Sequence, residues 1–319
     1  MKVGKTAFLF PGQGAQFVGM GRDVAARFPE AKALYDRADR VLGFSLSGAC
    51  FEGPEDRLTA TDVSQPAILV TSLALLAALK TTPAGKNLRP EAAAGLSLGE
   101  YTALAAAGAI EFDDAVRLTH LRGRFMQEAC DAVGSGMVSL LGVDEAGAEK
   151  ICDAARAAGI IWPANYNSPG QVVVSGVRAA CDRVLEIAES MGAQRAVPLV
   201  VAGGFHSPLM TSARTKLAPE LRGLRFQELR FPVVANVTGD YYSGAAAVAD
   251  LLERQVDGAV RWQQGVSRLI ADGFDRFYEI GPGRVLTGLL KRIDRKVGRD
   301  AVAVGSVADI EALSKPPSA

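Results

Sequence analysis

Short apolar runs alternate with longer stretches of mixed polarity in the N-terminal third of the chain. The run at residues 7–10 predicts a buried strand, and the apolar pattern at residues 67–79 predicts a helix. A strand-to-helix turn follows at Ser97, where residues 101–107 indicate a helix that ends at Gly108. Elements that alternate in this order are typical of a parallel α/β sheet covered by helices.

The pattern changes between about residues 136 and 201. The expected strands cover residues 137–143, 160–164, 172–175 and 196–201, and the expected helices cover residues 145–158 and 178–191. This βαββαβ order matches a ferredoxin-like unit. Strands expected at residues 231–236 and 276–280 then return to the first pattern. The sequence therefore predicts a small second domain inserted into a larger one.

Ser97 lies in a Gly-x-Ser-x-Gly segment, between Gly95 and Gly99. On a tight strand-to-helix turn, such a serine takes up a strained backbone conformation, and flanking residues without a Cβ let the neighbouring segments pass closely. The turn sets the hydroxyl at a helix N-terminus, where backbone N–H groups can hold an anion. The spacing predicts a nucleophile that attacks a carbonyl group. An ordinary structural turn is the alternative that the spacing leaves open.

The chain has only two histidines, so we expect no histidine-based metal site. His120 lies in a helical-looking run, where a packing or surface role fits. His206 follows a hydrophobic strand and two glycines and precedes a Ser-Pro turn, which places it on a loop at a strand end. A histidine with no catalytic part is the alternative there. Because an activated serine needs a base, His206 is the candidate.

The composition of the chain indicates which partners and which cellular location to expect. The 35 basic and 35 acidic residues cancel, so the net charge favours neither nucleic acid nor membrane as a partner. The longest apolar stretch, residues 66–78, is expected to be too short to span a bilayer, and a strand so close to Met1 argues against a signal peptide. The four scattered cysteines form no C-x-x-C pair. We therefore expect a cytoplasmic protein with inert thiols.

Several segments form an ordered set of motifs. Phe8 to Gln16 and Gly95 to Glu100 resemble the F-P-G-Q-G-x-Q and G-H-S-x-G-E signature motifs of the malonyl-CoA:acyl carrier protein transacylases. The remaining matches are the arginine motif at residues 122–129, the histidine motif at 205–207, and the segments at 165–171 and 279–283. They occur in the family's order from residue 8 to residue 292. Leu96 departs from the family, which usually has histidine there.

The resemblance implies an acyltransferase of fatty acid or polyketide synthesis that moves a malonyl group from malonyl-CoA to the phosphopantetheine thiol of acyl carrier protein. Ser97 would be the nucleophile and His206 the base of a ping-pong mechanism, with no metal or redox cofactor. The predicted fold is α/β, with an α/β-hydrolase-like parallel-sheet domain (1–133 and 204–319) and an inserted ferredoxin-like domain (134–203). The pathway, the oligomeric state and the effect of Leu96 stay open.

The resemblance also assigns groups around the reacting carbonyl. The backbone N–H groups of Leu98 and Gln13 would hold the oxyanion, and the backbone carbonyl of Gln255 would orient His206. Gln13 is otherwise a plain turn residue after Pro11 and Gly12.

Further residues would bind the acyl group. Arg122 would pair with the malonyl carboxylate through two parallel hydrogen bonds, unless it is one of several charges on a solvated helix face. Phe205 and Leu98 match the malonyl-selective pattern of related acyltransferases, although both could be core residues. Asn165 would line the pocket, unless it belongs to a turn before Ser168.

A basic segment is the candidate surface for acyl carrier protein, which is strongly acidic. Residues 284–299 hold six basic residues and the single acid Asp294. Lys291 and Arg292 share a face of the expected helix with Arg295. A solvated basic helix face is the alternative.

Two other functions stay open at this stage. A serine esterase or thioesterase would use the same turn with an acid such as Asp144 or Asp182 between Ser97 and His206. An inactive acyltransferase-like docking scaffold would need none of this chemistry, although the joint presence of Ser97, His206 and Arg122 argues against it.

Overall fold

The computed structural model describes residues 4–313, which divide into two compact units. Of the described residues, unit 1 comprises 4–123, 226–234 and 269–313, and unit 2 comprises 124–225 and 235–268. Three of the four boundaries between them fall inside helices α8 (Phe112–Ala132) and α13 (Trp262–Ala271) and the short strand β7 (Val233–Ala235), and the fourth, between residues 225 and 226, lies outside helices and strands. Unit 2 includes more of the chain than the insertion expected at residues 134–203. That residues 134–203 form a domain of their own stays a prediction.

A parallel sheet forms the centre of unit 1. Its strands have the order β10 (Val302–Val304), β9 (Phe274–Ile280), β1 (Lys5–Phe10), β2 (Ala92–Gly95) and β7, with the two-residue strand β8 (Asp240–Tyr241) after β7. Leu9 of β1 pairs with Glu279 on one side and Ala94 on the other. β1 is buried from Thr6 onwards and β2 over its whole length. The alanines of β2, weak strand formers by themselves, are held by this central position.

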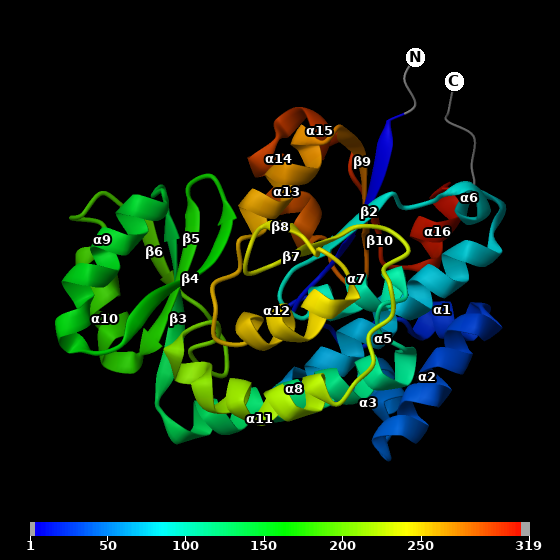
Figure 1. Cartoon of the computed structure of the whole chain (residues 1–319), viewed down its shortest axis with the longest axis horizontal. Helices are drawn as coiled ribbons and strands as arrows, with labels where there is room; N and C mark the ends of the chain where they lie inside the picture. Colours follow the sequence, from blue (N-terminus) through cyan, green and yellow to red (C-terminus); the bar gives the residue numbers. More distant parts are fainter. Residues whose placement is uncertain (1–3, 314–319) are drawn as a thin grey trace. The chain divides into compact units, whose positions relative to one another are not determined.

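Helices pack on this sheet and on one another. They are α1 (Arg22–Arg27), α2 (Pro29–Leu42), α3 (Leu46–Glu52), α4 (Glu55–Thr59), α5 (Thr61–Thr81), α6 (Pro83–Asn87), α7 (Gly99–Ala107), α14 (Val285–Ile293), α15 (Arg295–Arg299) and α16 (Val307–Leu313). Helix α5 packs against α2 and α7 (Figure 1). It is longer than the predicted 67–79, and by length and composition it could cross a membrane, contrary to the sequence expectation. However, 83% of its most apolar window is buried in the protein, as in a core helix.

Helix α5 continues through Pro66 because another helix donates a hydrogen bond to the backbone carbonyl group that proline cannot serve. Pro66 has no N–H to donate to the carbonyl of Asp62, four residues earlier. Nδ1 of His120, on α8, lies 2.9 Å from that carbonyl oxygen and supplies the hydrogen bond. The ring of His120 also lies beside Phe44. The expected packing role of His120 is confirmed.

Unit 2 contains a four-stranded antiparallel sheet with the order β4 (Ile161–Ser168), β5 (Gln171–Val177), β3 (Ser135–Leu141) and β6 (Arg195–Pro198). Helices α9 (Glu145–Ala155) and α10 (Arg178–Ile187) pack on the sheet, and η1 (Arg156–Ala158) extends α9 (Figure 1). Val138, Leu140, Val172 and Val174 alternate along the strands to fill the shared core. This is the predicted ferredoxin-like arrangement, and the predicted α/β fold class is confirmed.

The remaining elements of unit 2 follow β6. They are η2 (Pro208–Met210), α11 (Thr211–Arg222), η3 (Ala245–Ala247) and α12 (Val248–Gln255). The strand predicted at residues 196–201 is wrong at its end, because β6 stops at Pro198 and Leu199 to Val201 are exposed. The apolar side chains there suggested strand, but beyond the hydrogen bond from Leu199 to Met137 no strand partner continues the ladder within the described residues.

Candidate active site

Ser97 occupies the turn between β2 and α7 in a left-handed conformation, with φ of 51°. A Cβ on Gly95 would lie 1.9 Å from backbone atoms of Gly99, and one on Gly99 would lie 2.1 Å from the carbonyl oxygen of Phe10. Both flanking glycines are therefore required by the close approach of β1, β2 and α7. Among residues 4–313, only Ser97 and His206 are non-glycine residues with positive φ. Such conformations persist where the surrounding structure imposes them, and they concentrate at functional sites.

The predicted oxyanion donors, the N–H groups of Leu98 and Gln13, belong to two segments next to the Ser97 turn. Leu98 is buried at the N-cap of α7, so its N–H is among those without a partner inside the helix. Gly12 lies against Leu96, since a Cβ on Gly12 would come 2.4 Å from the Leu96 carbonyl oxygen. This contact brings the loop of Gln13 to the Ser97 turn. The Gln13 side chain lies 3.5 Å from Oγ1 of Thr61.

Arg122 points at the same turn from α8. Its side chain is only 1% exposed, and Nη2 donates to Ser97 Oγ at 3.1 Å while Nη1 donates to Gln65 Oε1 at 2.6 Å. The guanidinium also lies over the ring of Tyr101, 5.5 Å from its centroid. Burial lowers the pKa of Arg122, and the nearby Tyr101 and Glu100 oppose that shift. The solvated-face alternative is wrong for this residue.

In unit 2, His206 is 4% exposed and has φ of 55°. Its Nδ1 lies 2.9 Å from the backbone carbonyl oxygen of Gln255, the last residue of α12. A carbonyl only accepts, so Nδ1 carries the proton and Nε2 carries the lone pair of the neutral ring. Carbonyl groups at a helix C-terminus lack intrahelical donors and stabilise a nearby positive charge. The contact predicted between His206 and Gln255 is present.

Two other predicted residues belong to unit 2. Phe205 is buried next to His206. Asn165 is half-buried in β4, in register with Val173, and forms a bridge to Val260. Because β4 runs to Ser168, Asn165 is a strand residue, and the turn alternative is wrong.

Lys291 and Arg292 lie in the last turn of α14. Lys291 lines a hollow of about 670 Å³ in unit 1 together with Arg295, Lys296 and Arg299. Arg292 is not among its lining residues. The hollow therefore collects four cationic side chains from the end of α14 and from α15.

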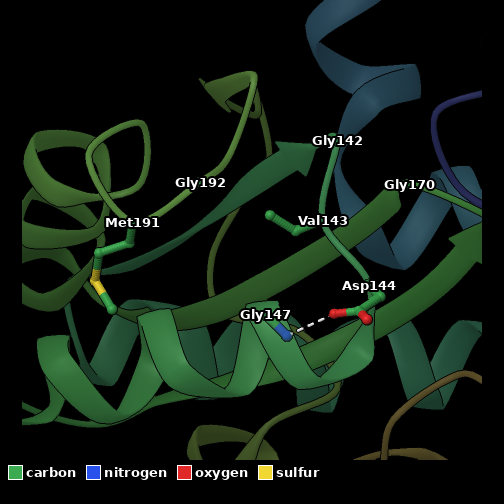
Figure 2. A pocket seen from close by; sticks show the side chains of 7 residues that line it. All are labelled: Gly142, Val143, Asp144, Gly147, Gly170, Met191 and Gly192. Atoms are coloured by element: carbon green, nitrogen blue, oxygen red, sulfur yellow. Dashed lines mark hydrogen bonds between the residues drawn. The ribbon is translucent and has the colours of Figure 1, made fainter.

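A hollow of about 490 Å³ lies at one end of the four-stranded sheet of unit 2 (Figure 2). It is lined by residues from three loops and the start of α9: Gly142, Val143, Asp144, Gly147, Gly170, Met191 and Gly192. Asp144 accepts a hydrogen bond from the Gly147 N–H and so caps α9. Of the candidate residues named from the sequence, Asp144, the possible acid of an esterase, lines it. In the described residues, no three His, Cys, Asp or Glu side chains gather as a metal site would need.

Comparison with known proteins identifies the family. The family model described as the acyl transferase domain matches residues 7–310. The chain belongs to the acyl transferase family. Its relatives include the malonyl CoA-acyl carrier protein transacylases of Bacillus subtilis, 42% identical over 94% of this chain and 93% of the relative, and of Escherichia coli K12, 42% identical over 90% and 92%.

Solved structures of acyl transferases are also similar to this chain. One from Streptococcus pneumoniae has a TM-score of 0.92 and 41% identity, covering 98% of this chain and all of that one. Another, a malonyl-transacylase in complex with a type II PKS acyl-carrier protein, has a TM-score of 0.91 and 39% identity, covering 97% and 98%.

Gln65 is the site residue that the sequence did not reveal. It lies in the second turn of a buried helix, 57 residues from Arg122 in the chain. A polar residue just before the apolar run of α5 was the only signal.

Proposed function

We propose that this acyl transferase moves a malonyl group from malonyl-CoA to the phosphopantetheine thiol of acyl carrier protein. The observation that carries the proposal is the buried guanidinium of Arg122, 3.1 Å from Ser97 Oγ. A cation beside the nucleophile suits an acyl group that ends in a carboxylate, as malonyl does and acetyl does not. The relatives, which are malonyl CoA-acyl carrier protein transacylases, support the same donor and acceptor.

In the first half-reaction, Ser97 Oγ attacks the thioester carbonyl carbon while Nε2 of His206 takes the hydroxyl proton. This transfer requires the two atoms to meet within about 2.6–3.2 Å. The N–H groups of Leu98 and Gln13 hold the oxyanion of the tetrahedral intermediate. The C–S bond then breaks, and His206 returns the proton to the CoA thiolate.

In the second half-reaction, His206 takes the proton of the phosphopantetheine thiol, and the sulfur attacks the malonyl-serine ester. The C–O bond breaks, and the proton goes back to Ser97 Oγ. The carbonyl of Gln255 keeps the Nδ1 proton in place and stabilises the imidazolium that forms in each half-reaction.

Acyl selectivity comes from three kinds of contact in this proposal. Arg122 pairs with the carboxylate. Phe205 occupies the space that an α-methyl group would need, and the half-buried Asn165 lines the pocket.

Acyl carrier protein binds at the basic end of α14, through Lys291 and Arg292. The hollow beside Lys291 supports this surface, because its four cationic side chains suit a strongly acidic partner. Nucleic acid and membranes are not partners in this proposal.

The esterase alternative loses support at His206. A catalytic triad would place a carboxylate at Nδ1, whereas Nδ1 bonds to the Gln255 carbonyl. Asp144, a candidate acid, caps α9 instead.

The cytoplasm is the proposed location. The four free and buried cysteines fit a reducing compartment, where thiols stay unpaired.

Mass spectrometry of the intact protein after brief exposure to malonyl-CoA tests the proposal. The wild-type protein should gain one malonyl group, and Ser97→Ala should gain none. His206→Ala should acquire it about a thousandfold more slowly, as when one member of a catalytic unit is removed. A malonyl adduct on Ser97→Ala would overturn the assignment of the nucleophile.

A further inference from the structure

Three contacts dock α8 onto the start of α5, and all lie around Arg122. The first is the hydrogen bond between His120 Nδ1 and the Asp62 carbonyl, which Pro66 leaves without a donor in its own helix. The second is a close backbone approach at Gly123. A Cβ there would lie 2.2 Å from the Thr61 carbonyl oxygen and 2.8 Å from Cα of Asp62.

The third contact is the hydrogen bond from Arg122 Nη1 to Gln65 Oε1, at 2.6 Å between two buried side chains. Because the guanidinium is planar, fixing one terminal nitrogen on Gln65 and the carbon Cζ over the ring of Tyr101 leaves little freedom for the other nitrogen. That other nitrogen, Nη2, bonds to Ser97 Oγ. Gln65 accepts the bond from Nη1 with an uncharged amide oxygen and so leaves the positive charge of Arg122 intact. A carboxylate in its place would neutralise that charge.

We propose that Gln65 is the positioning residue that aims Arg122 at the acyl group and so sets the preference for malonyl over acetyl. The inference rests on the proposed malonyl transfer. A flexible arginine would lose conformational entropy when it binds the substrate carboxylate, whereas the arginine held by Gln65 has its plane set beforehand. Gly123 serves the same end, since any side chain there would force α8 away from α5.

The test compares rates of Ser97 acylation by malonyl-CoA and by acetyl-CoA, followed by intact-protein mass spectrometry at several substrate concentrations. Gln65→Leu should lower the malonyl rate at limiting substrate by about tenfold, the size of one charge-assisted hydrogen bond, while the acetyl rate changes by less than about threefold. Gln65→Glu, which keeps the shape, should lose more malonyl activity because its carboxylate competes with the substrate for Arg122. Both effects should appear mainly in KM.

Matched variants distinguish a loss of the positioning of Arg122 from a loss of folded structure. Gly123→Ala should lower the malonyl-to-acetyl ratio, whereas Gly288→Ala in α14, where a Cβ meets nothing within 4 Å, should leave it unchanged. Gln227→Leu, at an exposed position of unit 1, is the control for Gln65→Leu. If the wild-type protein acquires malonyl on Ser97 but folded Gln65→Leu and Gln65→Glu keep the wild-type ratio, the positioning role is wrong and the proposed function stands. A wild-type protein that acquires no malonyl group contradicts the proposed function itself.

Discussion

At the scale of single residues, Ser97 and His206 share a backbone conformation that non-glycine residues avoid. Each such residue costs on the order of 1–3 kcal/mol, which the surrounding structure must offset. At Ser97 the offset comes from the packed junction of β1, β2 and α7, where Gly95 and Gly99 fit without a side chain. At His206 it comes in part from the hydrogen bond to Gln255.

Strain at Ser97 predicts an unusual order of stability. Ser97→Gly should be more stable than Ser97→Ala by about 1 kcal/mol in urea unfolding, because only glycine adopts positive φ without penalty. At Ser212, an exposed position in helix α11, alanine should be the more stable variant by about the same amount. The same order at both positions would contradict strain at Ser97.

Arg122 gives a second prediction at this scale. Arg122→Ala should lose malonyl transfer, by roughly 1.5–3 kcal/mol of transition-state stabilisation, while acetyl transfer holds steady or rises. Arg122→Lys should recover only part of the malonyl activity, since an ammonium cannot form two parallel hydrogen bonds. Steady-state rates with both CoA esters measure this. Equal losses for the two acyl groups would make Arg122 a structural residue.

Local spacing pointed to Ser97 but left an ordinary structural turn open, and the family resemblance led from His206 to its contact with Gln255. Gln65 could not be found in this way, because its role depends on how α5 and α8 meet in space and not on its neighbours in the chain. Arg122 was ambiguous for the same reason: its burial excludes a solvated charge, and the sequence does not state burial.

At the scale of elements, α14 begins at a buried carboxylate and ends at a basic surface. Glu279 accepts hydrogen bonds from the N–H groups of Leu286 and Thr287, which satisfies the first turn of the helix. Burial raises the pKa of Glu279, and these hydrogen bonds oppose the shift. The C-terminal turn holds Lys291 and Arg292. The Gly281-Pro282-Gly283 motif thus precedes a helix whose start is fixed and whose end is charged.

Reversal of charge on α14 should weaken recognition of acyl carrier protein. Lys291→Glu with Arg292→Glu should raise the apparent KM for that partner by about tenfold, more so at low salt, where steering is least screened. Acylation of Ser97 by malonyl-CoA should change much less. Arg27→Glu with Lys86→Glu makes the same change of net charge at exposed positions of unit 1 and is the control. No effect on the KM would dismiss the surface, and equal effects on both half-reactions would point to CoA binding or misfolding.

Periodicity predicted the strands and helices of the ferredoxin-like unit because each has one buried face. It was less accurate where tertiary contacts decide. Helix α5 starts six residues before the predicted boundary because His120 satisfies the carbonyl that Pro66 leaves over. The strand at β6 was predicted too long because exposed valines have the same β propensity as buried ones.

At the scale of the whole molecule, all four cysteines are free and buried. Burial raises the pKa of Cys50, Cys130 and Cys152 from about 9 to about 12. The fold therefore keeps these thiols protonated where the unfolded chain ionises them, so stability should fall as pH rises from about 9 towards 12. Urea unfolding at pH 7, 9 and 10 measures the decline.

The same burial should protect the thiols from reagents that attack thiolates. Folded protein at pH 8 should take up little iodoacetamide, whereas protein unfolded in urea should take up four equivalents. Rapid modification of the folded protein would contradict inert cysteines.

The place of β1 in its sheet has a consequence for how the chain folds as it is made. One edge of β1 pairs with β2 soon after synthesis begins, but the other waits for β9, about 180 residues later. At about 5–20 residues per second, that edge stays open for roughly 10–40 s, with the apolar side chains of Phe8 and Phe10 beside it. Residues 135–198, which form the sheet of unit 2, are all synthesised within that interval.

Proteolysis of ribosome-bound chains that stop before Phe274 should therefore spare residues 135–198 and cut near Phe8. Protection of β1 at that length would contradict this order. The nascent chain must keep the segment of Ser97 next to an unfinished sheet, so chaperones that shield exposed strands should matter more to its yield than the stability of the finished fold.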